Sequence, residues 1–489
     1  MKRSSGVLMH ISSLPGEYGE GSFGAEAKEF VDFLRDCGFS YWQTLPFCMP
    51  DEFNSPYKSF SAFSGNVNFI DLPSLEDMGL ITAKELEEQK QSTPYVCEFS
   101  ELSAKRMSVL ESAARRAFND TALRSKIQAF AESNIHIDLF CRFMAKKSVN
   151  DNLSWIEWRE PYDTELHEVE KDAYFTWLFT QYIHFTQWME IKKYANDKGV
   201  RIIGDIPFYV DYDSSDVWAS PELFQLDERR RPKSVAGVPP DYFSADGQMW
   251  GNPLYNWDMM KDADFSWWRQ RMRHMLTMFD GVRIDHFRGL ESYFSIPADA
   301  ENARSGKWIK GPGKAFIDSI KNVSGDKLII AEDLGIITDD VKDLVKYSGF
   351  PGMSVLQFAF MGDMNSPHLP HNYDNNTVAY TGTHDNNTLL GYVWELDAAA
   401  RRRLFRYCGY DGESLDDCYD SILRTMFASH AGLLILPIQD LLGYGEDTRM
   451  NRPGLESGNW GYRVTRQQLA SIHKDKFRHW NELYGRGNL

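Results

Sequence analysis

The sequence predicts an α/β protein built on a closed barrel of eight parallel strands, a (β/α)₈ TIM barrel. A strand, a helix and a second strand follow one another within the first 45 residues, which is the pattern of a parallel βαβ unit. Six later apolar segments also have the character of strands, so eight can be counted. Three of these eight end in a carboxylate, as expected where barrel strands open onto an active site.

The first unit begins with an apolar strand at residues 7–9 and ends with a second strand at 41–45. Between them, apolar residues at positions 27, 30, 31 and 34 recur at helical spacing, and Gly38 stands where a helix C-cap is expected. The other six strands are predicted at residues 201–207, 281–285, 327–332, 354–360, 377–383 and 432–438. Eight parallel strands favour a closed barrel over an open sheet.

The chain has 489 residues, whereas a bare barrel needs about 250. We predict one catalytic domain over 1–489, with the surplus in two insertions. Residues 71–199 have helical periodicity and are predicted to form a helical subdomain inserted after the second strand. Residues 212–265 are rich in Pro, Gly and aromatic residues and are predicted to form an ordered loop over the active site.

Composition excludes several classes of protein. The net charge of -17 argues against a nucleic-acid partner. The six cysteines are scattered without a C-x-x-C pair, which predicts reduced thiols in a cytoplasmic protein. The apolar run at the N-terminus is too short for a signal peptide, and no stretch is apolar enough to cross a membrane. The oligomeric state stays open.

The first acidic strand end is Arg283-Ile284-Asp285. Because side chains alternate along a strand, Arg283 and Asp285 share a face. A neighbouring cation favours an ionised acid, which is the form that a nucleophile requires. A purely structural ion pair would give the same pattern, so both interpretations remain open.

The second acidic strand end is Glu332, which shares a face with Leu328 and Ile330. Burial and neighbouring carboxylates would let Glu332 keep its proton, as a general acid must. The alternative is a glutamate at a helix N-terminus, a role for which Asp333 is better placed.

The third acidic strand end is Asp385, below which small side chains leave room. His384 beside it is a candidate to bind a sugar hydroxyl, although an isolated histidine is more often a packed structural residue. Three converging carboxylates suit chemistry on a glycosidic bond. Asp205 adds a fourth acid, and aromatic and amide residues that suit sugar rings occur at 55–57, 248–253 and 458–460.

A calcium-loop pattern at residues 211–222 is imperfect, because Asp216 stands at the glycine position and Pro221 interrupts the end. Ser and Asp capping a helix explain it more simply. We therefore predict no metal. No cofactor is predicted either, since P-loop, G-x-G-x-x-G, H-E-x-x-H and G-x-S-x-G motifs are absent from the sequence.

Motifs at residues 10–15, 55–57, 61–66, 203–207, 236–243, 250–255 and 449–454, together with the three acidic strand ends, resemble those of the amylomaltases. These disproportionating enzymes are the 4-α-glucanotransferases of glycoside hydrolase family 77. The resemblance runs nearly end to end. It is weakest over 76–175, and residues 47–53 depart from the Gly-rich form usual in the family.

The resemblance implies that Asp285 is the nucleophile, Glu332 the acid/base and Asp385 the transition-state stabiliser. It also implies a barrel with inserted subdomains and no dedicated metal, and it places Tyr242 and Phe243 in a lid loop. The implied sugar-binding residues are Tyr57, Asp205, Gln248, Trp250, Arg283, His286, His384 and Asn459.

The expected activity is therefore retaining transfer between α-1,4-glucans and maltooligosaccharides, by double displacement. Retention predicts that the carboxyl groups of Asp285 and Glu332 lie roughly 5–5.5 Å apart. An α-amylase-like hydrolase is the alternative enzyme, because it needs only water in place of the acceptor. A catalytically dead glucan-binding protein is a further alternative, which the presence of all three carboxylates opposes.

Overall fold

A computed structural model describes residues 1–489 except 52, 241–244, 361–363, 413, 456 and 488–489. Its centre is a sheet of eight parallel strands in the order β10-β11-β12-β1-β2-β3-β6-β9. The strands are β1 Ser4–Leu8, β2 Tyr41–Gln43, β3 Arg201–Ile206, β6 Gly281–Ile284, β9 Leu328–Ala331, β10 Gly352–Val355, β11 Thr377–Tyr380 and β12 Leu433–Pro437.

The two outer strands of this sheet, β9 and β10, approach each other and nearly close the barrel. The backbone N–H of Ala331 donates to the carbonyl of Pro351 at 2.9 Å. The N–H of Met353 donates to Oδ1 of Asp333 at 2.7 Å. The predicted TIM barrel is confirmed, and all eight predicted strands are present. The sixth begins and ends earlier than predicted, because residues Leu356–Phe358 form a 3₁₀ helix instead of continuing the strand.

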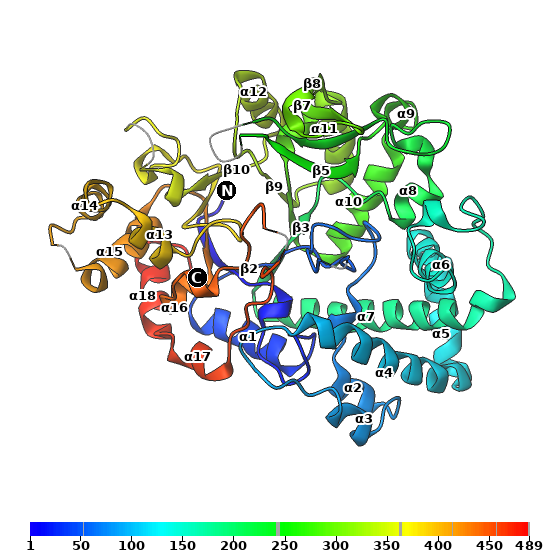
Figure 1. Ribbon diagram of the computed structural model, residues 1–489. Coiled ribbons are helices and arrows are strands. Elements are labelled where there is room, and N and C mark those ends of the chain that lie inside the picture. Colours follow the sequence, from blue (N-terminus) through cyan, green and yellow to red (C-terminus); the bar gives the residue numbers. More distant parts are fainter. Residues whose placement is uncertain (52, 241–244, 361–363, 413, 456, 488–489) are drawn as a thin grey trace.

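Helices cover the outside of the barrel. The helical spacing predicted between the first two strands is confirmed, because Ala27, Phe30, Val31 and Leu34 are buried on one face of α1. The helices outside the two insertions are α1 Ala25–Asp36, α10 Ser266–Met278, α11 Gly313–Ser324, α12 Asp339–Ser348, α13 Leu389–Glu395, α14 Ala398–Tyr407, α15 Leu415–Ala428, α16 Ile438–Leu442, α17 Arg466–Ser471 and α18 Lys474–Leu483. In Figure 1 the C-terminal α18 lies beside α1, and Arg478 Nε donates to the Asp36 carbonyl at 2.7 Å.

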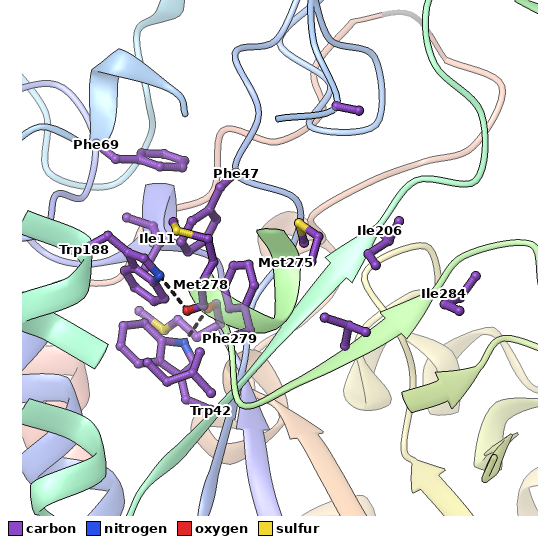
Figure 2. Packing of buried hydrophobic residues seen from close by; sticks show 14 of the residues in the cluster. Ile11, Trp42, Phe47, Phe69, Trp188, Ile206, Met275, Met278, Phe279 and Ile284 are labelled. Carbon is purple, nitrogen blue, oxygen red and sulfur yellow. Dashed lines mark hydrogen bonds between the residues drawn. The ribbon is translucent and has the colours of Figure 1, made fainter. Parts of the chain in front are cut away.

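Between β2 and β3 the chain is mostly helical. Its helices are α2 Leu72–Asp77, α3 Ala83–Glu87, α4 Phe99–Asn119, α5 Thr121–Ser133, α6 Ile135–Val149 and α7 Lys171–Asp197, and the longer ones lie on one side of the barrel in Figure 1. The long α7 joins this insertion to the barrel. Its Trp188 packs edge-on against Phe47 at 4.6 Å between ring centres and donates to the Met278 carbonyl at 2.9 Å (Figure 2). The description of this region as a subdomain stays a prediction.

A small antiparallel sheet, in the order β5-β4-β7-β8, accompanies the barrel. Its strands are β4 Ser234–Val238, β5 Gln248–Pro253, β7 Ser292–Pro297 and β8 Lys307–Lys310. Residues 212–265, which we expected to be a loop, therefore contain two strands as well as the short helices α8 Ser215–Ala219 and α9 Trp257–Asp262. Strands β7 and β8 were not predicted. Among the described residues, no helix combines the length and the apolar character needed to cross a membrane.

Candidate active site

Asp285 and Glu332 follow two neighbouring barrel strands and lie side by side at the rim. Ile284 of β6 pairs with Ala331 of β9, so the residues that follow them emerge at the same level of the rim. The Glu332 N–H donates to the Ile284 carbonyl at 3.1 Å. The Glu332 carboxyl in turn accepts from the His286 N–H at 2.7 Å and from the Leu334 N–H at 3.0 Å. The carboxyl of Glu332 is thereby fixed next to the residue that follows Asp285.

Arg283 lies between two carboxylates, as its alternation with Asp285 predicted. One guanidinium nitrogen bonds both oxygens of Asp205, at 2.8 and 2.9 Å, and another lies 2.9 Å from Asp285 Oδ1. Arg283 and Asp205 are almost fully buried, whereas the Asp285 side chain is 29% exposed. Burial alone would lower the pKa of Arg283, but the two carboxylates together raise it well above its ordinary value. The guanidinium therefore stays charged and holds Asp285 with one oxygen engaged.

Glu332 has the electrostatic character of a proton donor. Burial raises its pKa, Arg283 lowers it, the Asp285 carboxylate raises it, and the two backbone N–H groups lower it, with a result of about 7. A carboxyl with this pKa is largely protonated in mildly acidic solution and ionised in mildly basic solution. It can therefore both give and take a proton near neutral pH.

Asp385 reaches the site from the segment after β11. Its side chain is 46% exposed, and its Oδ1 lies 3.3 Å from His384 Nε2. The same Oδ1 accepts a hydrogen bond from Asn451 Nδ2 at 2.6 Å. Arg449 donates to the backbone carbonyl of Asp385 at 2.7 Å. The carboxyl thus has one restrained oxygen and is open to solvent.

A cleft of about 1570 Å³, including open solvent at its mouth, joins Asp285 to Asp385. Of the residues implied as sugar ligands, Tyr57, Gln248, Trp250, His286, His384 and Asn459 line it. Tyr57 stacks on His384, with 5.0 Å between ring centres and 14° between planes, and donates to Asp205 at 2.8 Å. Trp250 meets His286 edge-on at 5.1 Å. Such walls offer flat apolar faces together with polar edges, as sugar rings require.

Other implied site residues lie elsewhere or have other partners. Asp205 and Arg283 are beneath the cleft wall and act on Tyr57 and Asp285. Asn459 accepts from the Arg452 N–H at 2.9 Å and donates to the Leu455 carbonyl at 2.8 Å. Its side chain therefore also stabilises the turn formed by residues 452–455. Tyr242 and Phe243 lie outside the described residues. The carboxyl separation predicted for Asp285 and Glu332 stays a prediction.

Several cleft residues were not among our individually named site residues. Ser55, Met249, Asn252 and Trp460 lie within the segments 55–57, 248–253 and 458–460 that we expected to suit sugar rings. The others, which lie outside those segments, are Phe53, Lys58, Pro207, Phe208, Tyr209, Asn451, Pro453, Gly454 and Leu455. Of these, Asn451 is the one that bonds a candidate carboxylate. It comes from an irregular segment without a strand-end pattern. The only signal in the sequence was its place within the family-like motif at 449–454.

Two acids of the calcium-like segment, Asp213 and Asp216, bond to other parts of the protein. Asp213 pairs with Lys147 at 2.5 Å, and the Asp216 carboxyl accepts from the Ala62 N–H at 2.8 Å. Ser214 caps α8, as expected. Among the described residues, Glu160, Asp163 and His167 come close enough together to hold a cation. They lie on the helical insertion, and Lys146 already pairs with Asp163 at 2.9 Å.

A family model, two relatives and one solved structure agree on one family of enzymes. The family described as 4-alpha-glucanotransferase matches residues 9–469. A 4-alpha-glucanotransferase of Streptococcus pneumoniae is 43% identical over 502 residues, covering 100% of this chain and 98% of that protein. The chloroplastic/amyloplastic 4-alpha-glucanotransferase of Arabidopsis thaliana is 39% identical, covering 99% of this chain and 86% of that protein. The structure of an amylomaltase from Streptococcus agalactiae in complex with acarbose superposes with a TM-score of 0.95 at 39% identity, and each chain is covered fully.

Proposed function

The chain belongs to the 4-alpha-glucanotransferase family, and from this premise we propose how it performs that reaction. An α-1,4-glucan is cleaved, and its glycosyl part passes to the 4-hydroxyl of another glucan or of glucose. The reaction retains the α-configuration by double displacement, so that maltooligosaccharides exchange glucosyl units. Asp285 is the nucleophile, Glu332 the acid/base and Asp385 the stabiliser of the transition state.

In the first displacement, an oxygen of ionised Asp285 attacks the anomeric carbon of the donor. The bond from that carbon to the glycosidic oxygen breaks, and this oxygen takes the proton of Glu332. The shortened glucan leaves with a free 4-hydroxyl, and the other part remains as an ester on Asp285. Arg283 supports this step, because its guanidinium lies 2.9 Å from Oδ1 of Asp285 and so directs the carboxylate oxygens.

In the second displacement, Glu332 is ionised and takes the proton from the 4-hydroxyl of the acceptor. The acceptor oxygen attacks the anomeric carbon, and the ester bond to Asp285 breaks. Both carboxyl groups return to their starting forms, and no bond is lost overall. Asp385 lines the same cleft as Asp285 and lowers the energy of the positive charge that develops on the sugar in both steps.

The observation that carries this proposal is the environment of Glu332. Its carboxyl is bonded to the N–H of the residue after Asp285, and its pKa is about 7. A residue that must donate a proton and then accept one works best when its pKa lies near the working pH. The Asp285 carboxylate contributes to that value, and it disappears as a charge once the ester forms, which favours ionisation of Glu332 for the second step.

An α-amylase-like hydrolase remains the alternative, since water would replace the acceptor in the same scheme. The similarity to relatives named 4-alpha-glucanotransferase favours transfer. We also propose that the protein is cytoplasmic, that α-1,4-glucans are its partners, and that it acts without a metal. Its six cysteines are free thiols, as is usual in a reducing compartment.

Substitution of each carboxylate tests the assigned roles. Asp285→Asn, Glu332→Gln and Asp385→Asn should each lower transfer by at least about 100-fold, because each acts on the same transition state. Circular dichroism and thermal melting should show that the variants are folded. Near wild-type turnover in any one variant would remove that residue from the mechanism. Activity that survives thorough chelation would support the metal-free reaction.

A further inference from the structure

Asp385 is held by a segment of the chain that lies far from it in sequence. The side-chain N–H of Asn451 donates to Asp385 Oδ1 at 2.6 Å. The backbone N–H of Asn451 donates to the His384 carbonyl at 3.1 Å. Arg449 donates from one nitrogen to the Asp385 carbonyl at 2.7 Å and from another to the Asn451 carbonyl at 2.8 Å. Side chain and backbone of Asp385 are therefore both fixed by residues 449–451.

The segment 449–451 is in turn held in place by hydrogen bonds of the residues that follow it, among them Asn459. Asn459 accepts from the Arg452 N–H at 2.9 Å and donates to the Leu455 carbonyl at 2.8 Å. The Trp460 N–H donates to the Met450 carbonyl at 2.7 Å. Side-chain and backbone hydrogen bonds thus stabilise the turn after Asn451. They restrain the segment from which Asn451 bonds to Asp385.

We propose that Asn451 is a positioning residue for the transfer reaction, which holds one oxygen of Asp385 so that the second oxygen is directed at the reacting sugar. This inference rests on the proposed function, because it matters only if Asp385 stabilises the transition state. Asn451 acts through Asp385 and takes no proton itself.

The chemistry of the contact explains why asparagine suits this position. An amide N–H donates to a carboxylate oxygen, so it holds Oδ1 of Asp385 in place and leaves the second oxygen available to the sugar. The carboxyl side chain is half-exposed and follows a short strand, so packing alone restrains it weakly. A fixed donor reduces the reorganisation that Asp385 must undergo as charge develops on the sugar.

Two substitutions at Asn451 separate the effect of its hydrogen-bond donation from the effect of its side-chain shape. Asn451→Ala removes the donor, and kcat should fall about 10- to 100-fold with little change in KM, as expected for loss of one hydrogen bond to a charged group. Asn451→Asp keeps the shape but places a like charge against Asp385, and it should be worse than Asn451→Ala. If Asn451→Asp instead retained more activity than Asn451→Ala, shape rather than donation would matter, and the proposal would fail.

A double-mutant cycle tests whether Asn451 acts through Asp385. In the Asp385→Asn background, Asn451→Ala should lower the residual rate with an activated donor, α-maltosyl fluoride, by less than about threefold. An undiminished effect in that background would show a direct or general structural role and overturn the proposal. Arg452→Ala is the matched control, because Arg452 is adjacent and its side chain makes a surface ion pair with Glu446; activity should be nearly unchanged.

The same double-mutant cycle distinguishes failure of the role assigned to Asp385 from failure of the positioning role of Asn451. If Asp385→Asn alone had near wild-type activity, the assigned role of Asp385 would be wrong, and the positioning role would fall with it. If Asp385→Asn were inactive while Asn451→Ala had full activity, only the inference about Asn451 would fail.

Discussion

At the scale of single residues, the pKa of Glu332 leads to a prediction about pH. In the first displacement Glu332 must be protonated, so kcat/KM should fall as the pH rises through about 7. With α-maltosyl fluoride as donor the leaving fluoride needs little protonation, and its release reports the first displacement alone. In Glu332→Gln this release should be flat across the same pH range.

The control for this experiment is wild-type enzyme with maltotriose, where protonation of the leaving oxygen is required. A fall of the same size near pH 7 in Glu332→Gln, with either donor, would mean that another group titrates there. Glu332 would then lose its assignment as the acid.

How much of the site the sequence could predict depends on how each residue is positioned. Asp285 and Glu332 directly follow regular strands, so alternation and strand register locate them and their neighbour Arg283. Asn451 and Arg449 belong to an irregular segment and meet Asp385 only through tertiary folding. Asn459 has the composition of a sugar ligand, but its amide is also bonded within its own turn, which no local pattern reveals.

At the scale of elements, the attachment of α7 to the barrel should depend strongly on Trp188. This side chain is fully buried, and it donates to the Met278 carbonyl (Figure 2). Trp188→Ala should cost about 3–5 kcal/mol through the cavity that it leaves. Trp188→Phe keeps most of the ring and should cost about 1–3 kcal/mol, mainly because a buried carbonyl loses its partner.

Thermal melting of the two variants beside the wild type checks this prediction. The expected order of Tm is wild type, then Trp188→Phe, then Trp188→Ala. Equal Tm values for wild type and Trp188→Ala would contradict the view that this contact joins the helical insertion to the barrel.

The segment between β4 and β5 gives a second prediction at this scale. Val238 at the end of β4 pairs with Gln248 of β5, and Gln248 and Trp250 line the cleft. The residues between these strands include Tyr242 and Phe243, which the family resemblance assigns to a lid. If that lid keeps water from the glycosyl-enzyme, replacing both with Ala should raise the ratio of hydrolysis to transfer several-fold without abolishing cleavage.

The ratio is measured by comparing new reducing ends with redistributed maltooligosaccharides. Aromatic residues at these positions could instead serve only to anchor the segment to the protein. An unchanged ratio in a folded, active double variant would support that anchoring role and remove the lid from the explanation of transfer.

The barrel strands could be predicted because each buries a short apolar run whose ends are marked in the sequence. The small sheet could not be predicted in the same way. Strands β7 and β8 follow β6, where the alternating βα pattern leads one to expect a helix, and Trp308 in β8 is partly exposed. In β4 and β5, Gly237, Gly251 and Pro253 weaken the strand pattern. Pairing with distant strands, rather than local preference, forms this sheet.

At the scale of the whole molecule, the structure brings four barrel strands, a small sheet and an irregular C-terminal segment to one cleft. Asp205 lies near the end of β3, Asp285 and Glu332 follow its neighbours β6 and β9, and Asp385 is bonded by Asn451 of the C-terminal segment. Water at about 55 M competes with every acceptor, so a transferase must bind sugar and exclude water while the intermediate exists. The aromatic side chains that line the cleft are suited to bind sugar, and the Tyr242 and Phe243 variants test whether a lid excludes water.

The most direct test of the central claim is to incubate the purified protein with maltotriose and count reducing ends while following chain lengths. Transfer breaks one glycosidic bond and forms another. We therefore expect glucose and longer maltooligosaccharides, with a nearly constant total of reducing ends. A total that rises in step with the maltotriose consumed, without longer products, would identify the protein as a hydrolase.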